Sequence, residues 1–290
     1  MKIATYRVGN ERRVGLVDER KLTIAPFDLP TDEARDGLLA VIRRKTLPAR
    51  LNPMPLREAT LEAPIPRPPR NIFCVGKNYR AHAKEFATSG FDSSAAQGEI
   101  PQHPIIFSKV PECVVADRAP VYMRPDVSTA IDYEAELAVI IGKGGRNIGK
   151  DKALDHVWGY TIINDVTARD LQGRHSQWLI GKSQDTFGPM GPWAVTPDEI
   201  DLARTHVRCW INDELRQDQS TAELIFDVPT LIATISQGIS LIAGDIIATG
   251  TPSGVGIGFK PPKYLRAGDV MRIEISGIGV LENQILELRA

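Results

Sequence analysis

The sequence predicts a mainly β protein with a minority of helix, in which a small β-rich N-terminal unit precedes a larger β domain closed into a barrel or sandwich. Short runs of β-branched and aromatic residues recur along the chain, with Gly and Pro between them at short spacing. A regular alternation of strands with helices is missing. The 290 residues are enough for one large core or two domains.

The N-terminal unit begins with three strand-like segments, "KIATYRV", "RRVGLVDE" and "KLTIAPF". The apolar spacing then changes to a helical one over 31–44, with Thr31 as the N-cap. Prolines accumulate in the segment that follows and favour extended chain. We therefore place a boundary near residue 70, which gives a small accessory domain over 1–70 and a main domain over 71–290.

Strand-like runs dominate the main domain. They are "NIFCVG", "PIIFSK", "YEAELAVII", "VWGYTIIND", "WAVTP", "VRCWIND", "DIIATG", "VMRIEI" and "NQILEL". Helical spacing is limited to "NYRAHAKEF", "TARDLQGRH" and "DVPTLIATIS".

Charge and composition narrow the classes of function. The 35 basic and 36 acidic residues are spread without long runs, so nothing marks a site for nucleic acid or an anionic membrane. Three widely spaced cysteines, Cys74, Cys113 and Cys209, indicate a reducing compartment. Neither a secretory signal nor a long uninterrupted apolar stretch is found. We expect a cytoplasmic protein whose partner is a small molecule or a second copy of itself.

The stretch "DYEAELAVIIG" over 132–142 carries two glutamates in an apolar strand. Strand alternation puts Glu134 and Glu136 on one face, about 6.5 Å apart. Two interpretations remain open. The glutamates lie on the solvent face of an edge strand, or they converge on a divalent cation, for which carboxylates are suitable hard oxygen ligands.

A third carboxylate follows the next strand in "GYTIINDVTARDLQ". Asp165 stands where the apolar strand ends and helical spacing begins, a place where ligands are often collected. The alternative is that Asp165 caps the following helix. Asp170, one turn inside that helix, is the weaker candidate for a ligand.

A possible general base lies in "GKNYRAHAKEF". On a helix His82 and Glu85 share a face at i and i+3, so the carboxylate can orient the imidazole. The alternative is a pair of surface residues without a catalytic role. A long loop of small and polar residues follows over 88–103, and such loops are often active-site lids.

Two lysines follow or interrupt apolar runs, Lys109 in "PIIFSKVP" and Lys182 in "WLIGKSQDTF". A partly buried lysine beside a metal can bind a substrate carboxylate or stabilise an enolate oxygen. The alternative for each is a surface lysine with a buried stem. The glycine-rich "GTPSGVGIGF" does not predict a phosphate site, because it continues into "KPPK" and not into a helix.

Seven blocks of the main domain occur in a fixed order. They are "NIFCVGKNYRAHAKE", "PIIFSKVPECVV", "DYEAELAVIIG", "GYTIINDVTARDLQ", "GKSQDTFGPMGPW", "GDIIATGTPSGVG" and "AGDVMRIEISGIGVLENQI". In this order the chain resembles the fumarylacetoacetate hydrolase family, in its bacterial form with a short N-terminal domain. The resemblance covers residues 71–290.

The resemblance implies the family's mixed β-roll, usually as a homodimer. It implies Mg²⁺ or Mn²⁺, with Ca²⁺ as a possible occupant in a crystal, held by Glu134, Glu136 and Asp165. The positions of His82 and Glu85 match the family's catalytic dyad on a lid.

The resemblance also implies roles for five further residues. Lys182 matches the lysine beside the metal. Arg169, Gln172 and Thr251 match positions that contact substrate in relatives, and Lys109 fits the block with a less defined substrate-binding role.

Such a site is expected to act on a small 2-oxo acid. The intact dyad favours hydrolysis of a carbon–carbon bond in a 2,4-dioxo acid, of the acylpyruvate or diketo sugar acid type, through a pyruvate enolate. The alternative is an isomerase or tautomerase of 2-hydroxy-diene-dioates, or an oxaloacetate decarboxylase, as in relatives from aromatic catabolism. A metal-binding module without catalysis is disfavoured by the complete dyad.

Overall fold

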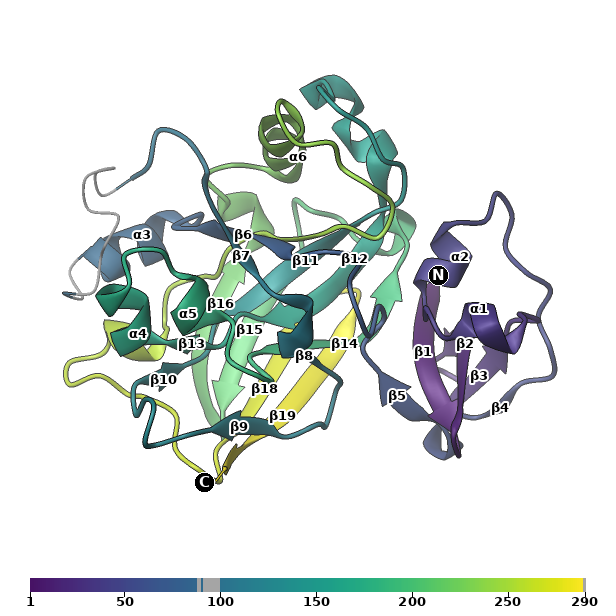
Figure 1. Cartoon of the computed structure of the whole chain (residues 1–290), viewed down its shortest axis with the longest axis horizontal. Coiled ribbons are helices and arrows are strands. Elements are labelled where there is room, and N and C mark those ends of the chain that lie inside the picture. Colours follow the sequence, from purple (N-terminus) through teal and green to yellow (C-terminus); the bar gives the residue numbers. More distant parts are fainter. Residues whose placement is uncertain (88–89, 91–99, 289–290) are drawn as a thin grey trace.

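The computed structural model describes residues 1–87, 90 and 100–288 (Figure 1). Its strands are β1 Lys2–Val8, β2 Glu11–Asp18, β3 Thr23–Pro26, β4 Met54–Pro55, β5 Thr60–Glu62, β6 Ile72–Gly76, β7 Ile105–Lys109, β8 Val114–Val115, β9 Val121–Met123, β10 Ile131–Asp132, β11 Ala135–Ile141, β12 Val157–Asn164, β13 Thr167–Ala168, β14 Gly188–Val195, β15 His206–Ile211, β16 Glu214–Ser220, β17 Ile246–Ala248, β18 Val270–Ile275 and β19 Gly279–Glu287. Its α-helices are α1 Thr31–Ala34, α2 Leu39–Ile42, α3 Arg80–Ala87, α4 Arg169–Arg174, α5 Leu179–Lys182 and α6 Val228–Ser236. The predicted mainly β class with a helical minority is confirmed.

The described strands form one large sheet, one smaller sheet and a short pair. The large sheet has 12 strands and contains the order β4-β3-β2-β1-β14-β12-β11-β17-β6-β7. The smaller sheet has the order β16-β15-β18-β19-β9, and β10 pairs with β13. The N-terminal strands lie to one side in Figure 1 and join the large sheet where β1 pairs with β14. The domain boundary near residue 70 stays a prediction.

Strand β11 runs through the interior of the large sheet. It pairs with β12 on one edge and with β17 on the other, and all of its residues are buried. Leu137 and Val139 pack into one hydrophobic cluster, whereas Ala138 and Ile140 pack into a second. A strand covered on both faces is apolar on both faces, and the interpretation of this segment as an exposed edge strand is therefore wrong.

The helix predicted over 31–44 is wrong, because the structure breaks it into α1 and α2. Gly37 lies between the two helices at φ +63° and turns the chain, so that the next N–H, that of Leu38, donates to Thr5 Oγ1 at 3.0 Å. A left-handed residue ends a helix, and glycine takes that conformation without a steric penalty. Thr31 is not the N-cap either, since Pro30 holds that position.

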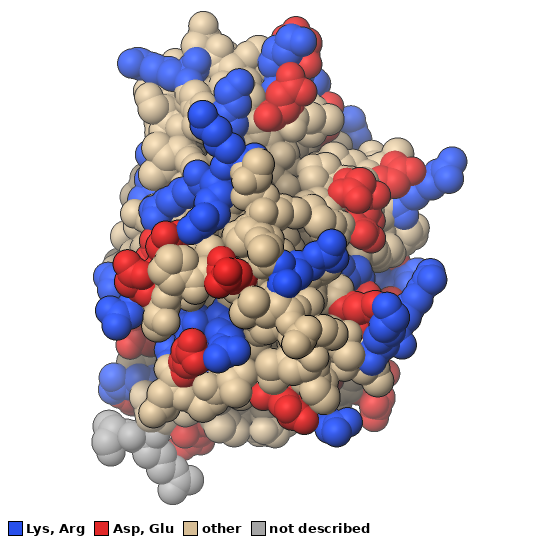
Figure 2. All heavy atoms as spheres, turned by 90° about the vertical axis from the view of Figure 1, so that its right-hand side faces the viewer, with Lys and Arg blue, Asp and Glu red and all other residues tan. Residues whose placement is uncertain are grey.

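The other predicted helices and strands are found close to where the sequence places them. The segments around 78–86, 167–175 and 227–236 contain α3, α4 and α6. Among the described residues no helix has the length and apolarity needed to cross a membrane. Figure 2 shows basic and acidic side chains interspersed over one face. The three cysteines are buried and unpaired.

Truncation of β11 tests its place between the two clusters. Leu137→Ala removes a fully buried side chain, and we expect it to lower the free energy of unfolding by about 2–5 kcal/mol. Leu215→Ala is the control, because Leu215 is 49% exposed. We expect it to change the free energy of unfolding by no more than about 0.5 kcal/mol. Urea denaturation measures both values, and equal losses would contradict the packing described.

Candidate functional site

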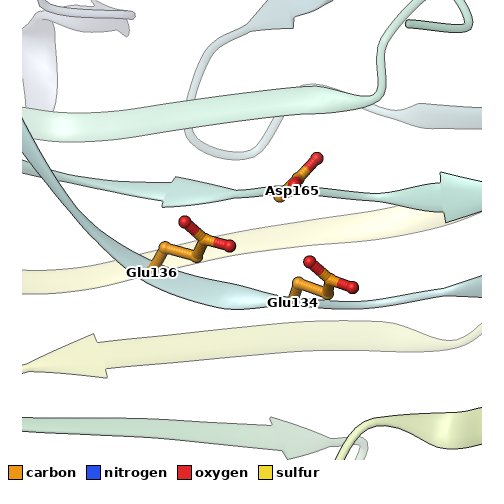
Figure 3. Close-up of side chains that lie close together, drawn as sticks. All are labelled: Glu134, Glu136 and Asp165. Carbon is orange, nitrogen blue, oxygen red and sulfur yellow. The ribbon is translucent and has the colours of Figure 1, made fainter. Parts of the chain in front are cut away.

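Three carboxylates meet where strand β11 begins and its neighbour β12 ends. Glu134 directly precedes β11, Glu136 lies within it, and Asp165 directly follows β12. The two strands pair so that the Asp165 N–H donates to the Glu134 carbonyl at 2.9 Å. Figure 3 shows both glutamates on the same side of the chain, near Asp165. One oxygen of each carboxylate lies within 4.8 Å of the others, and the three residues are 5%, 1% and 0% exposed.

The alternative role of Asp165 as a helix cap is wrong. Helix α4 begins at Arg169, its N-cap is Ala168, and no side chain caps it. The side chain of Asp165 is occupied instead by two lysines.

These two lysines compensate part of the negative charge. Lys182, the last residue of α5, donates from Nζ to Glu134 Oε2 at 2.8 Å and to Asp165 Oδ2 at 2.7 Å. Lys109, at the end of β7, donates to Asp165 Oδ1 at 2.7 Å, to the Val166 carbonyl at 3.1 Å and to the Lys182 carbonyl. Both lysines are buried, so the alternative of surface lysines is wrong.

The carboxylates differ in proton affinity. Burial alone would raise the pKa of Glu134, but the cations Lys182 and Arg169 outweigh it and hold this pKa at about 2. Burial also acts on Glu136, and there the carboxylates of Asp165 and Glu134 add to it, so its pKa lies well above the ordinary value. Glu136 is therefore the carboxyl of the cluster that holds a proton most strongly.

Arg169 connects the cluster to a fourth buried carboxylate. Its Nε donates to Asp132 Oδ2 at 2.9 Å, and its Nη1 lies 2.7 Å from Glu134 Oε1 and 3.1 Å from Gln172 Oε1. Burial would lower the pKa of Arg169, but Glu134 and Asp132 raise it above its ordinary value. The guanidinium is thus a permanent buried cation.

The predicted histidine and glutamate pair is present on α3. His82 Nδ1 lies 3.1 Å from Glu85 Oε2. The Gly254 N–H donates to both oxygens of Glu85, at 3.0 and 3.2 Å. Since His82 also helps to lower the pKa of Glu134, its ring is electrostatically coupled to the carboxylate cluster.

One pocket is lined by His82 of the pair and by Glu134 of the cluster. It is lined by Val75, Gly76, Lys77, His82, Phe86, Phe107, Glu134, Arg169, Gln172, Trp178, Lys182 and Thr251. Three aromatic rings cover one side, because Trp178 packs edge-on against Phe86 at 6.0 Å and against Phe107 at 5.0 Å. A Cβ at Gly76 would lie 2.6 Å from the Trp178 ring, so the wall is closely packed.

The structure brings most of the predicted site residues to this pocket. Arg169, Gln172 and Thr251 line it together with Lys182. Thr251 is held by two hydrogen bonds, to the Ala135 carbonyl at 3.0 Å and from Gln217 Nε2 at 2.8 Å. The predicted lid over 88–103 falls largely outside the described residues.

Sequence reasoning missed Asp132 and the pocket residues Lys77, Phe86, Phe107 and Trp178. Asp132 lies two residues before Glu134, so strand alternation would place it on the same face as the two glutamates. This alternation could have identified it from the sequence. The aromatic wall comes from three separate segments, and no local pattern reveals it.

Comparison with known proteins gives the family. The family model described as fumarylacetoacetate (FAA) hydrolase C-terminal matches residues 71–286. The chain belongs to this family.

Relatives within the family agree over most of the chain. Oxaloacetate tautomerase YisK of Bacillus subtilis (strain 168) is 52% identical over 231 residues, which are 79% of this chain and 74% of the relative. Oxaloacetate tautomerase FAHD2B, mitochondrial, of Bos taurus is 40% identical over 257 residues, which are 88% and 78% of the two chains. The solved structure titled fumarylacetoacetate hydrolase (EaFAH) from psychrophilic Exiguobacterium antarcticum has a TM-score of 0.83 and 41% identity, and the match covers 99% of this chain and all of that one.

The donor set of this family member fits a divalent cation. Three carboxylates within 4.8 Å offer only oxygen ligands, which suit hard divalent ions. Burial and the neighbouring carboxylates disfavour the ionised form of Glu136, and a bound cation would offset this effect. Glu134, Glu136 and Asp165 are the residues that would hold it.

Metal binding is expected to release a proton from Glu136. Its raised pKa keeps this carboxyl protonated to higher pH than an ordinary glutamate, and a ligand carboxylate must be ionised. The metal Kd should therefore fall as pH rises, by up to about tenfold per pH unit below that pKa. Calorimetric titration with Mn²⁺ in buffers of different ionisation enthalpy counts the protons.

Glu136→Gln is the matched variant for this experiment. It has no proton to release, so its weaker metal binding should vary less with pH. A wild-type Kd independent of pH, without proton release, would contradict the assignment.

Proposed function

We propose that the chain is a divalent-metal-dependent tautomerase that interconverts the enol and keto forms of a 2-oxo diacid of the oxaloacetate class. The observation that carries the proposal is one small pocket lined by His82, Lys182 and Glu134. Behind this lining, Glu85 contacts His82, and Lys182 donates to Glu134. Relatives named oxaloacetate tautomerases, at 52% and 40% identity, support this isomerase type of reaction over the hydrolysis that the sequence favours.

Keto–enol exchange requires a proton to move between carbon 3 and the oxygen on carbon 2. In enolisation His82 takes the proton from carbon 3, and the imidazolium, stabilised by Glu85, then gives that proton to the oxygen on carbon 2. Ketonisation runs the same two transfers in reverse. Lys182 donates a hydrogen bond to the oxygen on carbon 2 as negative charge develops there. A bound divalent ion would polarise the 2-oxo group and favour enolisation.

The other pocket residues bind and orient the diacid. Arg169 Nη2 is buried and has no hydrogen-bond partner among the described residues, so this nitrogen is the donor left for a substrate carboxylate. Gln172 and Thr251 add polar contacts beside it. The rings of Phe107 and Trp178 limit the size of the substrate and exclude water.

The second candidate function is hydrolysis of a 2,4-dioxo acid. The observation that favours it is the same dyad, since His82 held by Glu85 can equally take a proton from water. A structure titled fumarylacetoacetate hydrolase, at 41% identity, supports this candidate.

The proposal includes Mg²⁺ or Mn²⁺ as the metal and a homodimer, as the family resemblance implies, and a cytoplasmic location, as the cysteines and composition indicate. Sedimentation velocity of the purified protein tests the dimer. A monomer at micromolar concentration would remove that part of the proposal.

A substrate panel separates the two candidate functions. We expect Mg²⁺ or Mn²⁺ to accelerate the ketonisation of enol-oxaloacetate, followed by ultraviolet absorbance, and a chelator to abolish the effect. Acylpyruvates serve as the comparison, with pyruvate release as the readout. Pyruvate release without tautomerisation would replace the proposal by hydrolysis.

Two variants separate the cluster from the dyad. Glu134→Ala removes a predicted ligand and should lose both metal binding and activity. His82→Ala should bind metal as the wild type does and lose about 10²–10⁴-fold in kcat. Calorimetry and enol decay measure the two effects.

His206→Ala is the matched control for His82→Ala. His206 Nδ1 also lies 3.1 Å from a carboxylate, that of Asp218, but the pair is exposed. Its loss should leave kcat unchanged. If His82→Ala retained full kcat, the assigned base would be wrong.

A further inference from the structure

One backbone segment contacts both the carboxylate cluster and the dyad. It is Gly250–Gly258, which we call the glycine loop. The Gly250 N–H donates to Glu136 Oε2 at 2.7 Å, and the Gly254 N–H donates to Glu85. The loop thus carries donors to the two carboxylates from one short run of chain.

The glycines of this loop permit its close approach to carboxylates. A Cβ at Gly258 would lie 2.0 Å from Glu85 Oε1, and a Cβ at Gly256 would lie 2.7 Å from Asp132 Oδ1. A side chain at either position would displace the carboxylate that now lies there. The glycine-rich segment does not fit a phosphate site, but its glycines leave room for the carboxylates of Glu85 and Asp132.

Asp132 holds the far end of the glycine loop. Its side chain is fully buried, and Oδ1 accepts the N–H groups of Tyr133 at 2.9 Å and Gly256 at 2.7 Å. Oδ2 accepts the Ile257 N–H at 3.0 Å and Arg169 Nε at 2.9 Å. Four donors converge on one carboxylate, so both of its oxygens have hydrogen-bond partners although the side chain is buried.

The same carboxylate reaches the metal cluster through Arg169. The guanidinium is bound by Asp132 at Nε and by Glu134 at Nη1. A continuous chain of contacts therefore runs from Glu134 through Arg169 and Asp132 to the glycine loop, and from the loop to Glu85.

We propose that Asp132 is a positioning residue that fixes the predicted metal carboxylate Glu134 and the dyad carboxylate Glu85 relative to each other. Residues that hold the ligands of a metal are typically worth about 10–100-fold in metal affinity or activity. For its catalytic part the inference rests on the proposed function. The structural part of the inference does not depend on that function, because it is tested by the metal affinity and by hydrogen exchange in the glycine loop.

Asp132→Asn is the test, because it keeps the shape and changes the chemistry. An amide retains one acceptor for Gly256 and places an N–H group against the donors of Ile257 and Arg169. We expect the Kd for Mn²⁺ to rise and kcat to fall, each by about tenfold or more. Hydrogen exchange in the peptide that covers Gly250–Gly258 should become faster.

Asp245→Asn is the matched control. Asp245 is also fully buried, accepts Arg70 Nε at 2.7 Å and accepts the Ile242 backbone N–H at 2.8 Å. It should lower the melting temperature to a similar extent and leave the Kd, kcat and glycine-loop exchange close to wild type. If both variants changed the site equally, or if Asp132→Asn lowered only the melting temperature, the positioning role would be wrong.

Arg169→Lys keeps the test decisive if Asp132→Asn does not fold. A single ammonium group cannot hold Asp132 and Glu134 in the guanidinium geometry, so the Kd for Mn²⁺ should rise while glycine-loop exchange stays near wild type. An unchanged Kd would overturn the link through Arg169. If the wild-type enzyme does not tautomerise enol-oxaloacetate, the proposed function fails, and the metal and exchange measurements still decide the role of Asp132.

Discussion

Repulsion among three buried carboxylates is the constraint on which the rest of the site depends. Two like charges about 4 Å apart repel by about 4 kcal/mol at an effective dielectric constant near 20, and Glu134, Glu136 and Asp165 lie within 4.8 Å of one another. Lys182 and Lys109 offset the repulsion at Asp165, and Lys182 also offsets it at Glu134. Glu136 receives a backbone N–H and keeps a raised pKa. A divalent cation bound among the three carboxylates would offset the repulsion that remains.

The fold keeps these charges together because β11 cannot move without disturbing two cores. Its alternate residues belong to different hydrophobic clusters, and both of its edges are paired. Packed interiors resist displacement of a strand, so the glutamates at its start are held in place although they repel. Stability of the core and function of the site are linked through this strand.

Sequence alone predicted the elements that obey local rules. Strand parity placed Glu134 and Glu136 on one side, and helix spacing placed His82 beside Glu85. Parity also applied to Asp132, but its partners are backbone N–H groups of Gly256 and Ile257, more than 120 positions away in the chain. Such partners are set by tertiary structure and leave no local pattern. The broken helix near Gly37 has a similar cause, because its turn is completed by donation to a residue of β1.

Residue identity also could not decide the reaction. A base that takes a proton from water takes one equally well from carbon 3, so the same His82 and Glu85 serve hydrolysis and tautomerisation. The distinction lies in which atom of the substrate is placed against the imidazole. Under the proposed function, that placement depends on Arg169 and on the aromatic wall.

Anomalous diffraction from crystals soaked in Mn²⁺ tests the central claim most directly. The account predicts a strong peak bounded by the carboxylates of Glu134, Glu136 and Asp165. Absence of a peak there at saturating Mn²⁺, or full occupancy only at another site, would contradict it.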